Sequence, residues 1–177
     1  DGTPGSTDQA TVTITVTEVN DVPITADDLV TTSEDNALTF NAADLLLNDT
    51  TGPANESGQT LTVISVTATA DTHGTVVLNG DGTITYTPDA DFNGTASFAY
   101  TVTDDGTTDG SPDAQSTTGT VNVTVSEVND GPTANTDSIV AVEDTPLTFN
   151  ASDLVVNDNA GPADESDQTL TVTAVSA

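Results

Sequence analysis

The stretch Glu127-Val128-Asn129-Asp130-Gly131-Pro132 repeats an earlier one, Glu18-Val19-Asn20-Asp21-Val22-Pro23. Each copy follows a segment of alternating apolar and polar residues. Each ends in a proline, which lacks the backbone N–H that a strand ladder needs. Between strand and proline lie carboxylate and amide side chains, whose oxygens are the ligands that a hard cation such as calcium takes. The repeated stretch therefore predicts a joint between successive domains.

The two joints divide the chain into three parts. Residues 1–20 are predicted to be the last strand of a preceding repeat, residues 21–130 a complete repeat, and residues 131–177 the first strands of the next repeat. The third part matches residues 22–68 without a gap at more than half of its positions. The spacing from Glu18 to Glu127, one period of the chain, is the size of a small domain and far exceeds the period of a solenoid repeat.

The charge balance excludes several classes of partner. The 177 residues include 29 Asp and Glu, one His and no Lys or Arg, so no carboxylate can pair with a basic side chain. Two carboxylates about 4 Å apart repel by roughly 4 kcal/mol at an effective dielectric constant of about 20, so clustered acids need bound cations or ample solvent. Nucleic acid and anionic membranes are predicted not to be partners. Direct membrane insertion is not expected, because no apolar run approaches the roughly 20 residues of a span.

Period-two alternation in Thr-rich runs predicts strands rather than disorder. We expect one strand at residues 11–18, and seven in the complete repeat, at residues 24–32, 37–42, 60–69, 75–78, 83–87, 95–103 and 119–127. Residues 43–47 are expected to form a helical turn, and Asn79-Gly80-Asp81-Gly82 a hairpin turn. The pattern predicts an all-β, seven-stranded antiparallel immunoglobulin-like sandwich. Its inward-facing side chains should include Leu38, Phe40, Leu61, Val63, Val76, Ile84, Tyr86, Phe98, Tyr100, Val121 and Val123.

Several words of this repeat resemble a known family. They are Asp81-Gly82-Thr83-Ile84-Thr85-Tyr86, the run Pro88-Asp89-Ala90-Asp91-Phe92-Asn93-Gly94-Thr95 and the joint itself. Together they are similar to the cadherin-like tandem repeats of giant bacterial surface proteins, including the extender regions of RTX adhesins and biofilm-associated proteins. The resemblance implies a tandem array of cadherin-like sandwiches with calcium (Ca2+) bound between neighbours, outside the cell. Many relatives carry an Asp-x-Asp-x-Asp-Gly loop where this chain has residues 48–58, which leaves the number of ions open.

The expected topology places the ligands that this resemblance implies. Because consecutive antiparallel strands alternate in direction, the end of the seventh strand, the bend after the first and the turn between the fifth and sixth should meet at one end of the domain. At the second joint, the candidate calcium ligands are Glu34, Asp89, Asp91, Glu127, Asn129, Asp130, Asn157, Asp158 and either Asp164 or Glu165. At the first joint they are Glu18, Asn20, Asp21, Asn48, Asp49 and Asp104. Other acids, namely Asp8, Asp71, Asp81, Asp109 and Asp113, are expected to form turns.

Catalysis is not expected. His73 precedes a glycine and has no nucleophile or second His as a partner, and Asp89 and Asp91 could serve as a glycosidase pair only with aromatic surface that the chain lacks. The favoured hypothesis is a calcium-stiffened extender of a secreted bacterial cell-surface adhesin, which projects an adhesive tip and contacts its neighbouring repeats through calcium joints. The alternatives are a module that binds glycan or a partner directly, and a subunit of an extracellular filament or surface layer with homotypic contacts.

Overall fold

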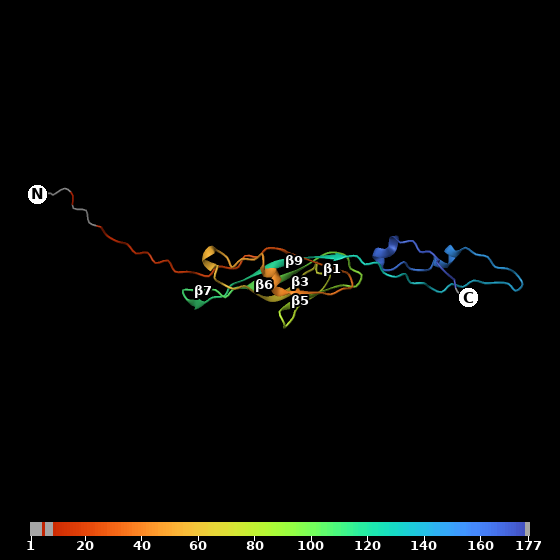
Figure 1. The fold of residues 1–177 in the computed structure, drawn as a ribbon, viewed down its shortest axis with the longest axis horizontal. Coiled ribbons are helices and arrows are strands. Elements are labelled where there is room, and N and C mark those ends of the chain that lie inside the picture. The colour runs from red at the N-terminus through yellow and green to blue at the C-terminus, as the bar shows by residue number, and fades with distance from the viewer. Residues whose placement is uncertain (1–4, 6–8, 176–177) are drawn as a thin grey trace.

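The computed structural model describes residue 5 and residues 9–175 (Figure 1). All of its strands lie between residues 28 and 126. The strands are β1 (Asp28–Ser33), β2 (Leu38–Asn41), β3 (Thr62–Ala68), β4 (Gly74–Leu78), β5 (Thr83–Pro88), β6 (Gly94–Thr103), β7 (Thr107–Thr108), β8 (Ser111–Pro112) and β9 (Ser116–Ser126). Four short 3-10 helices accompany them: η1 (Ala42–Leu46), η2 (Ala54–Glu56), η3 (Ala151–Val155) and η4 (Ala163–Asp167).

Two sheets form the predicted sandwich. One has the order β1-β9-β6-β3 and the other β2-β5-β4. The alternating side chains of the central strands point into the core, and Ile84, Tyr86, Phe98 and Val121 are completely buried. The expected core residues on flanking strands or just before them, Leu38, Phe40, Leu61 and Val76, are only partly buried, because they face the open sides of the sandwich.

The predicted antiparallel arrangement is wrong for one pair of strands. β1 and β9 run parallel, in a register that extends from Asp28 opposite Val121 to Ser33 opposite Ser126. The first and last of seven alternating strands point in the same direction, so they must run parallel once they are neighbours in a sheet. The loop predicted at residues 104–118 contains the two-residue hairpin of β7 and β8, an addition to the seven expected strands.

Two local predictions are confirmed. The expected helical turn at residues 43–47 is η1, shifted by one residue. The expected hairpin connects β4 and β5: the Asn79 N–H donates to the Thr83 carbonyl at 2.7 Å, and the Gly82 N–H donates to the Asn79 carbonyl at 3.1 Å. Short-range turn chemistry was sufficient for both predictions.

The strand predicted at residues 11–18 does not form. Val12, Ile14 and Val16 are each at least 80% exposed, and these residues extend away from the sandwich without a ladder partner (Figure 1). Alternation gives a strand only when another strand supplies hydrogen bonds. The assignment of residues 1–20 to a preceding repeat stays a prediction, and Asp8, the expected turn former, lies outside the described residues.

Residues 131–175 reproduce the local structure of the complete repeat without its strands. The isolated bridge between Ile24 and Thr50 recurs one period later between Thr133 and Asn159. η3 and η4 begin at the positions equivalent to the starts of η1 and η2. The strands predicted here are not formed, because the equivalents of β5, β6 and β9 are not among these residues.

Gly119 supplies a test of the core. It lies opposite Tyr100 in the β6–β9 register, and a Cβ atom at this position would collide with the Tyr100 ring. We expect Gly119→Ala to reduce the free energy of unfolding by about 1–3 kcal/mol, because the ring must leave its place in the core. Urea unfolding measures this change.

The matched control for this substitution is Gly80→Ala. Gly80 has nothing within 4 Å of an added Cβ. Its replacement is expected to change stability by no more than about 0.5 kcal/mol. Equal stability of the Gly119→Ala and Gly80→Ala proteins would contradict the close contact between Gly119 and Tyr100.

Candidate metal centre at the joints

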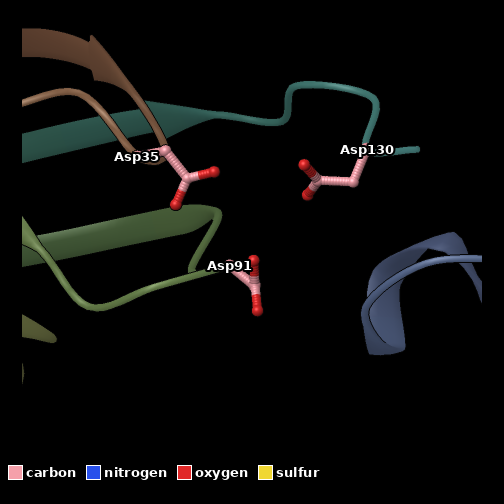
Figure 2. Close-up of side chains that lie close together, drawn as sticks. All are labelled: Asp35, Asp91 and Asp130. Atoms are coloured by element: carbon pink, nitrogen blue, oxygen red, sulfur yellow. The ribbon is translucent and has the colours of Figure 1, made fainter. Parts of the chain in front are cut away.

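The repeated stretches, residues 18–23 and 127–132, are the linkers at the first and second joints. Three carboxylates converge at the second joint, where the complete repeat meets its linker (Figure 2). Asp35 comes from the turn after β1, Asp91 from the turn between β5 and β6, and Asp130 from the linker. One carboxylate oxygen of each lies within 4.8 Å of the others. Asp35 and Asp91 both adopt positive φ, at 59° and 56°, a conformation that Asp tolerates better than most residues. The two turns therefore hold their carboxylates at the same end of the sandwich.

Two buried glutamates hold the linker between the repeats. Glu34 is completely buried, and its Oε1 accepts the Val128 N–H at 2.5 Å. Glu165 of η4 is 1% exposed, and its Oε1 accepts the Asp130 N–H at 3.0 Å. Gln168 donates from its side chain to the Asn129 Oδ1 at 2.9 Å. The linker is thus bound on one side by the complete repeat and on the other by the next.

The carboxylates at this joint raise one another's pKa. Burial, followed by the neighbouring charge of Glu165, raises the pKa of Glu127. Burial, followed by the charges of Asp35 and Asp91, raises the pKa of Asp130. Each shift reports a cost of holding negative charge at the joint. A bound cation would remove this cost by stabilising the ionised form.

A second acidic site surrounds the first joint. Asn20 is buried, and its amide donates to the Asp104 Oδ1 at 2.9 Å and to the Asp113 carbonyl at 2.8 Å. Its own Oδ1 accepts from Gln59 at 2.6 Å. A Cβ atom at Gly106 would collide with the Asn20 side chain, so glycine is required for this close approach. Asn20 therefore ties the linker to the loop that follows β6.

The unpartnered polar atoms fit a cation. In the described part of the chain, five buried side-chain atoms have no hydrogen-bond partner, and all five are oxygens. Asp104 Oδ2 and Gln59 Oε1 belong to the first joint, Asp130 Oδ2 and Glu165 Oε2 to the second, and Asp28 Oδ2 to neither. Buried acceptors without donors are costly, and hard cations such as calcium are bound by oxygens of these kinds. The second joint, where three carboxylates also converge, therefore suits a hard cation; among the described residues no such group of three carboxylates converges at the first joint.

Comparison with known proteins identifies the family. The profile of the cadherin-like domain matches residues 19–126, from the first linker to the end of β9. The chain belongs to the cadherin-like domain family. It is also similar to human Protocadherin Fat 1, at 33% identity over an alignment 163 residues long that covers 89% of this chain. The chain spans 3% of the length of that protein.

Cadherin-like domains generally bind Ca2+, are typically extracellular, and are non-enzymatic adhesion modules that adjoin one another in tandem. No helix in the described residues has the length and apolar character to cross a membrane. The acidic cluster at the second joint of this chain agrees with the calcium binding that is general in the family.

The structure brings most of the predicted ligands of this cadherin-like repeat to its two joints. The second joint gathers Glu34, Asp91, Glu127, Asn129, Asp130 and Asp164. The first gathers Glu18, Asn20, Asp21 and Asp104. Burial, followed by the charge of Glu56, raises the pKa of Glu18. Asp89 is placed in the expected turn but is not one of the three clustered carboxylates.

Asn48 and Asp49 contact the chain that enters β1 rather than the joint residues. Asp49 accepts the Ala26 N–H at 2.9 Å, and Asn48 donates to the Asp27 carbonyl at 3.2 Å. The loop folds back to close the Ile24–Thr50 bridge, which explains this placement. The equivalent residues Asn157 and Asp158 make the same contacts with residues 135 and 136.

Three residues at the joints are not predicted by the sequence pattern: Asp35, Glu56 and Gln59. Asp35 directly follows Glu34, but only the positive φ of the turn directs its carboxylate to Asp91 and Asp130. Glu56 and Gln59 surround the first joint from η2 and the residues after it. A usable signal existed for these two, because both recur one period later, as Glu165 and Gln168.

A third group of interacting side chains, Asp28, Asp49 and Tyr100, lies inside the cadherin-like repeat and apart from the clustered carboxylates of the second joint. The Tyr100 hydroxyl donates to the Asp49 carboxylate at 2.9 Å, and burial, followed by Asp49, raises the pKa of this hydroxyl. Burial, followed by the charge of Asp49, also raises the pKa of Asp28. A raised acid pKa means that the protonated form of Asp28 favours folding.

We therefore expect Asp28→Asn to stabilise the protein at neutral pH. The stabilising contribution of protonated Asp28 is complete below the ordinary value of 3.8 and is lost as pH rises through the raised value of the folded protein. The variant should match the wild type near pH ~3 and exceed its stability by about 0.5 kcal/mol at neutral pH, because the partly exposed charges are screened. Thermal melts across this pH range, in chelator, measure the difference. A difference in melting temperature between the variant and the wild type that does not change with pH would contradict the raised pKa of Asp28.

Proposed function

We propose that the chain is part of a calcium-stiffened extender of a secreted bacterial cell-surface adhesin, in which tandem domains hold an adhesive tip away from the cell. The observation that carries this proposal is the convergence of Asp35, Asp91 and Asp130, together with Glu165, whose Oε1 accepts the Asp130 N–H and whose Oε2 is buried without a partner. These oxygens come from two turns of one repeat, from the linker and from the next repeat. A cation bound by them would join all three parts.

Net charge supports the same role. The chain carries a formal charge of −29 and has no Lys or Arg, so the repulsion at the joints cannot be neutralised from within the chain. Extracellular modules bind calcium with dissociation constants of roughly 0.1–1 mM, a range suited to high occupancy outside cells and low occupancy in cytoplasm. At a hundredfold excess over its dissociation constant, one bound ion stabilises the folded state by about 2.7 kcal/mol.

The distribution of aromatic side chains favours a spacer over a glycan-binding module. Tyr86, Phe98 and Tyr100 are buried in the core, so they offer no surface to a sugar ring. His73 stacks on Phe92 with ring centroids 4.4 Å apart, which occupies one face of each ring. The bacterial setting is supported by the resemblance of the words in residues 81–95 to bacterial extender repeats.

Calcium removal tests the proposal. We expect the chain to be longer in small-angle scattering, and to melt at a higher temperature, in millimolar calcium than in chelator. The reason is that bound cations hold the linker against both neighbours and add binding free energy to the folded state. Unchanged dimensions together with an unchanged melting temperature would contradict the stiffening role.

A pair of charge-matched variants locates the effect. Asp130→Asn should weaken calcium binding in calorimetry by about tenfold, since it removes one charged ligand from the cluster. Asp81→Asn removes the same charge from the β4–β5 hairpin, where Asp81 accepts from Thr83. It should bind calcium as the wild type does. Equal affinity of the two variants would place the ions elsewhere.

A further inference from the structure

One side chain connects the complete repeat to the next without using the linker. Asn93, in the turn between β5 and β6, donates from Nδ2 to the Asp164 Oδ2 at 2.9 Å and to the Glu34 Oε2 at 3.4 Å. The other hydrogen bonds around this joint involve linker residues: Val128 with Glu34, Asp130 with Glu165, and Gln168 with Asn129. Among the described residues, the Asn93–Asp164 bond is the one that joins residues 28–126 directly to residues 133–175.

The chemistry of Asn93 differs from that of its surroundings. Asp35, Asp91 and Asp130 lie in the same joint and can only accept hydrogen bonds when ionised. A side-chain amide is neutral and has two N–H donors, so it can satisfy two carboxylates without a cation and without adding charge. Glu34 belongs to the complete repeat and Asp164 to the next, so Asn93 lies between carboxylates of both.

The turn that carries Asn93 is held in place. The Asp89 N–H donates to the His73 carbonyl at 2.9 Å, and the Phe92 N–H donates to the Asp89 carbonyl at 3.2 Å. The Phe92 ring packs between His73 and the edge of the core. The same turn therefore presents the Asp91 carboxylate to the cluster and the Asn93 amide to the next repeat.

We propose that Asn93 is a positioning residue that favours the aligned arrangement of the two repeats when no cation is bound. This inference rests on the proposed function and deepens it, because the Asn93–Asp164 hydrogen bond and the cations act on the same joint. By fixing Glu34 and Asp164 in advance, the amide reduces the ordering that a cation must impose when it binds. The joint then has two supports, a neutral hydrogen bond at low calcium and ions at high calcium.

The experiment measures the distance between equivalent points of the two repeats. The chain contains no Cys, so spin labels can be attached uniquely through Leu47→Cys and Val156→Cys, positions one period apart that are both more than 80% exposed. Pulsed electron resonance in chelator should show, in the otherwise wild-type chain, a narrow peak from aligned joints beside a broad component from bent joints, and calcium should convert the broad component to the narrow peak. In Asn93→Asp, an acid replaces the donor, and we expect the ratio of aligned to bent joints to fall about five- to tenfold.

The matched control is Asn79→Asp. Asn79 also donates two side-chain hydrogen bonds, to Thr83 and Thr85, but in the β4–β5 hairpin. This variant gains the same charge and should keep the narrow distance. The double variant Asn93→Asp with Asp164→Asn exchanges donor and acceptor, and it should restore most of the aligned population. The melting temperature of Asn93→Asp verifies that the sandwich is folded.

Three results would overturn the proposed role of Asn93: no narrow peak in the wild type in chelator, an Asn93→Asp chain with the same narrow fraction as the wild type, or a double variant with no larger narrow fraction than Asn93→Asp. If Asn93→Asp does not fold, Asn93→Ser is measured instead. This variant adds no charge, and it should also broaden the distribution of distances between the two spin labels. Repeating the measurements in calcium separates the two proposals. A wild type that does not respond to calcium contradicts the stiffening role, while the comparison in chelator still decides on Asn93.

Discussion

A chain without Lys or Arg must satisfy every buried carboxylate with neutral donors or with ions from outside. Glu34 and Glu165 accept linker N–H groups, and Asp104 accepts the Asn20 amide and two backbone N–H groups. These donors satisfy one oxygen of each of Glu165 and Asp104 and leave the other buried without a partner. The fold of the joints is therefore set by two demands, which are to supply amide donors and to bring the remaining oxygens together.

The sandwich itself does not depend on this charge problem. Its core is built from Ile84, Tyr86, Phe98, Val121 and other apolar side chains of the central strands, whereas the three clustered carboxylates lie at the second joint. This separation allows the joints to vary in charge and donor content while the apolar core keeps the turns in register. Asp35 and Asp91 meet because β1 and β5 end on the same side of the sandwich.

Local signals were sufficient for the strands and the hairpin, because alternation and turn residues act over a few positions. They failed at residues 11–18, where the pattern of Val12, Ile14 and Val16 needs a partner strand that the described chain does not supply. Reasoning from strand ends placed Glu34 and Asp130 at the second joint, where they lie, while their binding of calcium stays a prediction. It misplaced Asp49, because the position of a long loop depends on the segment that it folds against. Asp35 was missed because its direction depends on a single positive φ.

The parallel pairing of β1 with β9 has a mechanical consequence. In a string of such domains, tension enters at Asp28, where β1 begins, and leaves at Ser126, where β9 ends. These points lie at opposite ends of one parallel ladder of six residue pairs. Pulling therefore shears the whole ladder at once instead of unzipping it bond by bond. The geometry makes each domain resistant to force applied along the line from Asp28 to Ser126.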